Sequence, residues 1–136
     1  MKAEFELLLF STNTAFVSEA IAAGVTGVII DWENKGKDRR QALADTEINY
    51  DAVNDLRRIR ECTDTLVICR INSFHEQTPE EIEQAIDAGA DEILLPMVST
   101  IEEVDAVLNH VNGHCGVSTS ISPEEEENWG VIEGVF

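Results

Sequence analysis

Basic side chains are scarce in this chain of 136 residues, which carries 9 lysines and arginines against 27 aspartates and glutamates. The resulting net charge of −18 argues against binding to nucleic acid or to anionic membranes, because both repel a negatively charged protein. Many acidic globular proteins share this composition. The charge therefore excludes classes of partner without selecting one.

Several other features are missing. No apolar run approaches the roughly 20 residues of a membrane-spanning helix, and the short apolar stretch near the N-terminus has acidic flanks, unlike a signal peptide. The segment STNTAF at residues 11–16 contains neither a GxGxxG nor a Walker motif. The three cysteines (Cys62, Cys69 and Cys115) show no CxxC or paired spacing, which predicts reduced, buried thiols in a cytoplasmic protein.

One pattern occurs twice: small residues and a glycine end a helix, and a strand that is apolar on both faces follows at once. It appears as AAGVTGVIID at residues 22–31 and as AGADEILLP at residues 88–96. Strands buried on both faces and alternating with helices are typical of parallel sheets. We expect Pro96 to stop the second of these strands, because proline cannot continue the hydrogen-bond ladder.

The remaining elements follow from apolar spacing and helix-start motifs. The motifs at Thr78–Glu81 and Thr100–Glu103 predict capping boxes at the starts of two helices. The polar connection at residues 32–49 is long, and long ordered loops are often functional. The expected strands are 4–10, 27–31, 65–70, one ended by Pro96, and 115–121, and the expected helices are 14–23, 50–60, one from residue 78 and one from residue 100.

Five strands and four helices predict an α/β fold, the N-terminal five βα units of a (β/α)8 TIM barrel. A complete barrel takes about 250 residues, so we expect a partial barrel over residues 1–121 and an atypical acidic tail over 122–136. An open, doubly wound sheet of five strands fits the length without difficulty, so both architectures stay open. The unpaired edges of a partial barrel favour self-association, which predicts a homo-oligomer.

Polar side chains follow two of the expected strands. Asp31 and Glu33 come after one, and Arg70 and Asn72 come at the end of the next. The carboxyl ends of parallel strands meet at one edge, so an arginine and carboxylates would converge there and suit an anionic, oxygen-rich ligand. The alternative is that Asp31 and Glu33 form simple salt bridges with Arg70 or Arg40.

Three segments in this order resemble the HpcH/HpaI aldolase and citrate lyase β-subunit family of the phosphoenolpyruvate-binding TIM-barrel superfamily. They are GVTGVIIDWENKGKDRRQ, VICRIN and TPEEIEQAIDAGADEILLPMVSTIEEVDAVLNHV. The resemblance covers roughly residues 4 to 121. It implies the N-terminal part of such a barrel, truncated at its C-terminal side.

The resemblance implies a metal-dependent carbon–carbon lyase or aldolase that acts on a 2-oxo acid or an acyl-CoA through an enolate. Mg²⁺ or another divalent cation would act as a Lewis acid. Arg70 would be the catalytic residue beside the enolate oxygen and the substrate carboxylate, because negative charge develops on that oxygen. Asp31, Glu33, Arg40 and Asn72 would complete the substrate site.

Some positions depart from the family pattern. Ser122 stands where the resemblance implies a metal-binding glutamate, and Asn34, which cannot act as a base, stands where a histidine or aspartate is implied. The metal ligands therefore stay unassigned, and a non-catalytic barrel fragment that binds a partner or a carboxylate is the alternative function. Of the histidines, His75 lies where it could join the site, whereas His110 and His114 are expected to cap a helix at the surface.

Overall fold

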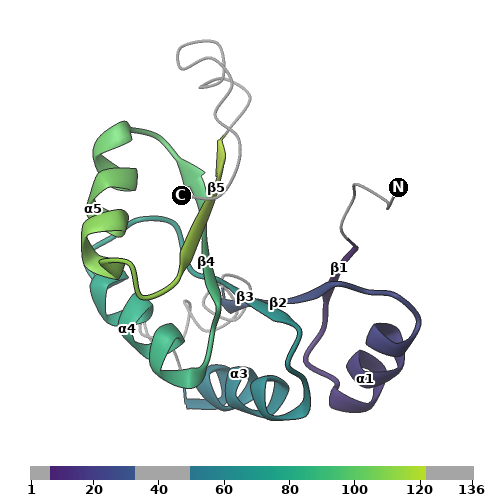
Figure 1. The fold of residues 1–136 in the computed structure, drawn as a ribbon. Coiled ribbons are helices and arrows are strands. Elements are labelled where there is room, and N and C mark those ends of the chain that lie inside the picture. The colour runs from purple at the N-terminus through teal and green to yellow at the C-terminus, as the bar shows by residue number, and fades with distance from the viewer. Residues whose placement is uncertain (1–6, 33–49, 122–136) are drawn as a thin grey trace, which may run out of the picture.

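The computed structural model describes residues 7–32 and 50–121 (Figure 1). Expectations for residues 4–6, for most of the polar connection and for the tail at 122–136 lie outside these ranges. Within them, no helix is both long enough and apolar enough to cross a membrane. Strands and helices alternate in the order β1 (Leu8–Phe10), α1 (Thr14–Ala22), β2 (Gly27–Asp31), α3 (Tyr50–Cys62), β3 (Leu66–Arg70), α4 (Thr78–Ala88), β4 (Glu92–Val98), α5 (Ile101–Val111) and β5 (Gly116–Ile121).

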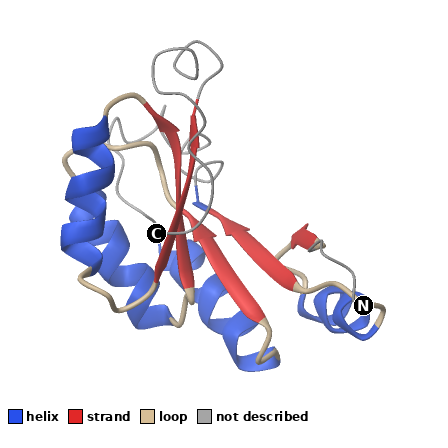
Figure 2. Cartoon of the chain, turned by 45° about the horizontal axis from the view of Figure 1, so that its top comes forward, coloured by secondary structure: helices blue, strands red, loops and turns tan. Residues whose placement is uncertain are grey.

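The strand order decides between the two expected architectures. The five strands are parallel and lie in the order β1-β2-β3-β4-β5. A doubly wound sheet would require the order to reverse at a switch point, and none occurs among these strands. Right-handed crossovers in one direction place the helices on one face of the sheet, and Figures 1 and 2 show α3, α4 and α5 along its outer side. The partial barrel is confirmed.

The sheet has one face that packs against the helices and one that does not. The packed face carries the core, and its strand residues are at most 1% exposed: Val28, Ile30, Val67, Cys69, Ile93, Leu95 and Val117. Side chains alternate along a strand, so the paired residues Ile29, Ile68 and Glu92 align on the opposite face. They are buried but do not belong to the core cluster. The same alternation places Asp31 and Arg70 on this helix-free face.

Strand β4 does not end at Pro96, and the expectation that proline would stop it is wrong. The strand runs on to Val98, and its pairing with β5 shifts register between Leu95 and Val98. Met97 takes a positive φ of 57° within this irregularity. A bulge interrupts the ladder locally, so a residue without an N–H group can be accommodated there.

One of the two expected capping boxes forms its cap, and the other does not. Thr100 is the N-cap of α5 and accepts a hydrogen bond from the Glu103 backbone at 3.3 Å. At α4 the N-cap is Gln77, and the Thr78 hydroxyl instead accepts from the His75 backbone at 2.8 Å. The sequence pattern correctly predicts the start of α4, but the predicted cap by Thr78 is wrong, because the Thr78 hydroxyl binds the preceding loop at His75.

Arg60, near the end of α3, links the connection between α3 and β3 to the connection between α4 and β4. Its guanidinium donates to the carbonyls of Thr63 and Thr65 at 2.8 Å each, to the Gly89 carbonyl at 3.1 Å and to Asp91 at 2.7 Å. The side chain also packs directly over Gly89, whose φ is 111°. This arginine therefore fixes the amino ends of β3 and β4, at the edge of the sheet remote from Arg70.

Replacing Gly89 by alanine should destabilise the fold more than replacing Gly24. Both glycines have positive φ, 111° and 122°, so each substitution should cost more than about 1 kcal/mol through backbone strain. An added Cβ at Gly89 would lie 2.5 Å from Arg60 Cγ, whereas nothing lies within 4 Å at Gly24. Urea unfolding of both variants measures the difference. Equal losses of stability would show that Arg60 does not constrain this turn.

The three cysteines differ in exposure. Cys69 is buried and Cys115 is half-buried, but Cys62 is exposed, so the expectation of three buried thiols is wrong for Cys62. Cys62 ends α3 outside the buried stripe that Leu56 and Ile59 form. Burial raises the pKa of the thiols of Cys69 and Cys115 above their ordinary value.

We expect iodoacetamide to alkylate Cys62 first in the folded chain and Cys69 last. Alkylation requires an accessible thiolate, and Cys69 combines full burial with a raised pKa. Mass spectrometry of peptides after timed labelling measures the order, and labelling in urea provides the unfolded reference. Rapid labelling of Cys69 before unfolding would contradict the packing of β3.

Candidate functional site

Arg70 and Asp31 form a two-pronged ion pair at the carboxyl ends of β3 and β2. The two residues are directly paired in the sheet register. Arg70 Nε donates to Asp31 Oδ1 at 3.1 Å, and Arg70 Nη2 donates to Asp31 Oδ2 at 2.6 Å. The side chains are 27% and 13% exposed, so the pair is partly withdrawn from water. The fork geometry fixes both the position and the orientation of the guanidinium.

Phe10, the last residue of β1, contacts the guanidinium of Arg70. Arg70 Cζ lies 5.3 Å from the centroid of the Phe10 ring, within the range of a cation–π contact. The Phe10 side chain is itself largely exposed. Three neighbouring strands thus contribute an aromatic ring, a carboxylate and a guanidinium to one point.

A cavity of about 460 Å³ opens at this point. Its volume is in the range that small-molecule sites occupy. It lies at the carboxyl ends of the strands, where barrel enzymes place their chemistry. Its lining residues are Phe10, Ser11, Thr12, Ile29, Asp31 and Arg70.

A second polar cluster follows β3. The carboxylate of Glu81, on the first turn of α4, is 2% exposed. The backbone N–H of Asn72 donates to Oε1 at 3.0 Å, and the Asn72 side-chain amide donates to Oε2 at 3.1 Å. His75 Nε2 contacts the same Oε2 at 2.7 Å. Glu81 therefore binds the loop after Arg70 at three points.

The bonding of His75 fixes its tautomer. Nδ1 accepts a hydrogen bond from the Gln77 backbone N–H at 3.0 Å. A nitrogen that accepts carries no proton, so the ring proton of the neutral imidazole sits on Nε2 and points to Glu81. Both ring nitrogens are engaged, which makes His75 a support for the loop in this arrangement and not a base facing the cavity.

Two opposing effects act on Glu81. Burial raises the pKa of Glu81 above its ordinary value, because a low-dielectric environment disfavours the charged carboxylate. The hydrogen bonds from Asn72 and His75 work in the other direction, because they favour the charged form. A buried carboxylate satisfied by three donors is costly to disturb, since removing it leaves those donors without partners.

The structure places part of the predicted site. Arg70 and Asp31 lie together, and Asn72 follows on the same edge with its amide turned to Glu81. Glu33 and Arg40 lie outside the described residues, as do Asn34 and Ser122.

The sequence does not identify Phe10 or Glu81 as site residues, nor Ser11, Thr12 and Ile29, which line the cavity. It predicts only a strand residue at Phe10 and a helix-cap residue at Glu81. A clue to Glu81 was available: it shares the buried face of α4 with Thr78, Ile82 and Ala85.

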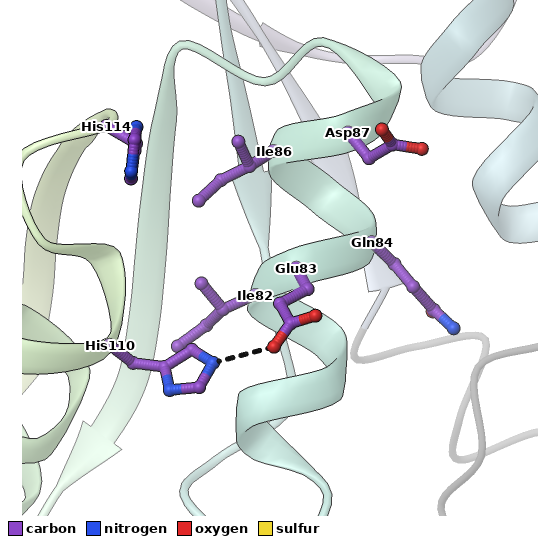
Figure 3. Close-up of a pocket in the computed structure, with 7 residues that line it drawn as sticks. All are labelled: Ile82, Glu83, Gln84, Ile86, Asp87, His110 and His114. Carbon is purple, nitrogen blue, oxygen red and sulfur yellow. Dashed lines mark hydrogen bonds and ion pairs between the residues drawn. The ribbon is translucent and has the colours of Figure 1, made fainter.

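A larger hollow, about 670 Å³, lies between α4 and α5 (Figure 3). Ile82 and Ile86 form its floor, and His110 Nε2 contacts Glu83 Oε2 across it at 3.2 Å. His110 lies in the last turn of α5, as expected for a surface cap. Its lining residues belong to α4 and α5 or, in the case of His114, precede β5. The hollow therefore does not lie at the carboxyl ends of the strands, and we do not assign the site to it.

The described residues do not supply a magnesium site. Among residues 7–32 and 50–121, no three histidine, cysteine or acidic side chains converge in a way that could hold a metal ion. Asp31 uses both carboxylate oxygens for Arg70, whereas Mg²⁺ requires an octahedral set of oxygen ligands. The donors at the described strand ends therefore do not fit the metal that the family resemblance implies.

We expect weak Mg²⁺ binding by this chain, with a dissociation constant above about 1 mM, which corresponds to roughly −4 kcal/mol. The reason is that Asp31 would have to leave Arg70 to bind the ion. Isothermal calorimetry measures the affinity, with the Asp31→Asn variant as control. Tight, stoichiometric binding that this variant abolishes would contradict the arrangement.

The sequence of this chain matches one family model over most of its length. The family model described as phosphoenolpyruvate phosphomutase matches residues 10–132. That match extends past residue 121, where the sequence suggested a boundary. No protein with curated annotation matches the chain.

Solved structures share the fold. The crystal structure of mandelate oxidase matches with a TM-score of 0.58 and 20% identity, over 81% of this chain and 40% of that one. Its complex with (S)-4-hydroxymandelic acid matches with a TM-score of 0.61 and 17% identity, over 87% and 46% of the two chains. The chain thus spans less than half the length of these enzymes. At such identities the likeness shows the fold alone.

The family match covers most of the chain, including β2, the Arg70–Asp31 pair and the loop that Glu81 holds. It confirms the superfamily of phosphoenolpyruvate-binding barrels that the strand-end motifs indicated. The chain belongs to the phosphoenolpyruvate phosphomutase family.

Proposed function

We propose that this chain forms part of an enzyme that acts on a small 2-oxo acid through an enolate, with Arg70 binding the substrate. The observation that carries the proposal is the Arg70 guanidinium, which Asp31 holds in place and which lines the strand-end cavity. Phosphoenolpyruvate, for which the family is named, is the phosphate ester of the enol of pyruvate. A site for it must accept a carboxylate next to an enol oxygen.

A reaction through an enolate requires a fixed positive charge beside the enolate oxygen. When the bond between the carbons α and β to the keto group of a 2-oxo acid aldol breaks, its electron pair forms the carbon–carbon double bond of an enolate, the carbonyl π pair moves to the carbonyl oxygen, and the β-carbon leaves as an aldehyde or ketone after its hydroxyl loses a proton. A cation already in place stabilises that oxygen without reorganisation during the reaction. Asp31 holds Arg70 from one edge and Phe10 covers its face, so the guanidinium is oriented before substrate arrives.

The cavity favours a small substrate. Its volume of about 460 Å³ suits a short carboxylic acid, and the hydroxyl-bearing residues Ser11 and Thr12 line it beside Phe10. We therefore favour a 2-oxo acid over an acyl-CoA, of which only the acyl end would fit this cavity. Cleavage or formation of a carbon–carbon bond, as in an aldolase or lyase, is the reaction that we propose. No step here depends on a metal, because the described donors do not fit one.

Replacing Arg70 by alanine should abolish binding of oxalate, a planar dicarboxylate that resembles the pyruvate enolate. In a form of the protein that turns over substrate, the same change should cost about 3–4 kcal/mol of transition-state stabilisation, the loss typical of an oxyanion donor. NMR titration measures binding, and Arg57→Ala is the matched control, because Arg57 is 47% exposed and pairs with Asp87 at 3.2 Å on the outer surface.

Three outcomes separate the alternatives. Oxalate binding that depends on Arg70, together with turnover of a 2-oxo acid, supports the enzyme. Binding without turnover by any form of the protein supports a non-catalytic carboxylate binder. Equal binding by the wild type and by Arg70→Ala would rule out both assignments of this site.

A further inference from the structure

The loop between β3 and α4 depends on one buried acid. Residues 71–77 connect the strand that ends in Arg70 to the helix that carries Glu81. The Glu81 carboxylate is 2% exposed and accepts from the backbone and side chain of Asn72 and from the ring of His75. Thr78, also buried, accepts from the His75 backbone. A bonded, buried carboxylate at the base of a strand-end loop requires an explanation beyond helix capping.

These contacts orient groups at the edge where Arg70 lies. Asn72 is two residues beyond Arg70. Because its Nδ2 donates to Glu81, the orientation of its amide is fixed, and Oδ1 is the end of the amide that is turned away from that bond. Asn72 does not line the cavity itself, so the network acts on the site through the position of the loop that leaves Arg70.

We propose that Glu81 is a positioning residue of the candidate site, which acts through Asn72 and His75 to hold the loop after β3 against the substrate bound at Arg70. This inference rests on the proposed function for its link to substrate. It makes the affinity of the site for its ligand depend on a side chain that does not line the cavity.

The test compares Glu81→Gln with Glu83→Gln. Both lie on α4, both lose one negative charge, and both carboxylates contact a histidine, but Glu83 is 73% exposed on the outer side and bonds to His110. In Glu81→Gln, an amide N–H would face the donors of Asn72 and His75, so the network cannot be completed. Two measurements follow each variant: the tautomer of His75 by ¹⁵N NMR and the affinity for oxalate.

We expect wild-type His75 to carry its proton on Nε2 alone, and Glu81→Gln to convert it to a mixture of tautomers. Oxalate affinity should fall by about tenfold, the lower end of the losses seen when supporting residues of a metal site are changed. Glu83→Gln should alter neither. An unchanged tautomer in Glu81→Gln, or an unchanged oxalate affinity despite a changed tautomer, would overturn the positioning role.

If Glu81→Gln does not fold, the variant Asn72→Ala tests the positioning role instead. Asn72→Ala removes only the side-chain bond to Glu81 and retains the His75 contact. It should lower oxalate affinity while leaving the His75 tautomer as in the wild type, and unchanged affinity would overturn the role of Asn72. If wild-type protein binds no oxalate, the proposed function fails, and a tautomer that still responds to Glu81→Gln separates that failure from a failure of the network.

Discussion

The ion pair between Arg70 and Asp31 is the interaction on which the site depends. An arginine at a strand end is long and flexible, and alone it would sample many positions. The two hydrogen bonds to Asp31, at 3.1 and 2.6 Å, hold the guanidinium in one plane. Removing either partner would take this counter-charge from the other, which is partly buried, and such a loss costs more than an intact pair contributes. The same ion pair therefore stabilises the carboxyl ends of β2 and β3 and orients the guanidinium that we propose binds substrate.

The barrel topology makes this pair possible. Parallel strands in sequential order bring residue 31 of β2 opposite residue 70 of β3. The helices cover the other face of the sheet, so the polar side chains at these strand ends are not forced into the apolar core. The two arginines have different roles at the two ends of the strands. Arg60 stabilises the amino ends through hydrogen bonds to carbonyls and to Asp91. Arg70 lines the cavity at the carboxyl ends.

The sequence predicted what depends on local pattern and chain order. The glycine-ended helices, the apolar strands and the meeting of Asp31 with Arg70 all follow from periodicity and from the geometry of parallel sheets. Other details did not follow, because they depend on tertiary contacts. Pro96 lies in a strand because β5 tolerates a register shift beside it. Thr78 does not cap α4, because the loop before it takes its hydroxyl.

The role of Glu81 is a further detail that did not follow from the sequence. A glutamate three residues after a threonine is the usual mark of a capping box, and only its place on the buried face of α4 indicates another use. Which donors meet that carboxylate depends on the path of the loop from Arg70 to α4, and residue type does not encode that path. Phe10 was missed for the same reason, since its contact with Arg70 crosses from β1 to β3.

The most direct measurement is a crystal structure of this chain with oxalate. The account predicts oxalate in the strand-end cavity, with a carboxylate within hydrogen-bond distance of Arg70 and with the Arg70–Asp31 pair intact. Oxalate bound instead in the hollow between α4 and α5 (Figure 3), or bound at the strand ends without contact to Arg70, would contradict it.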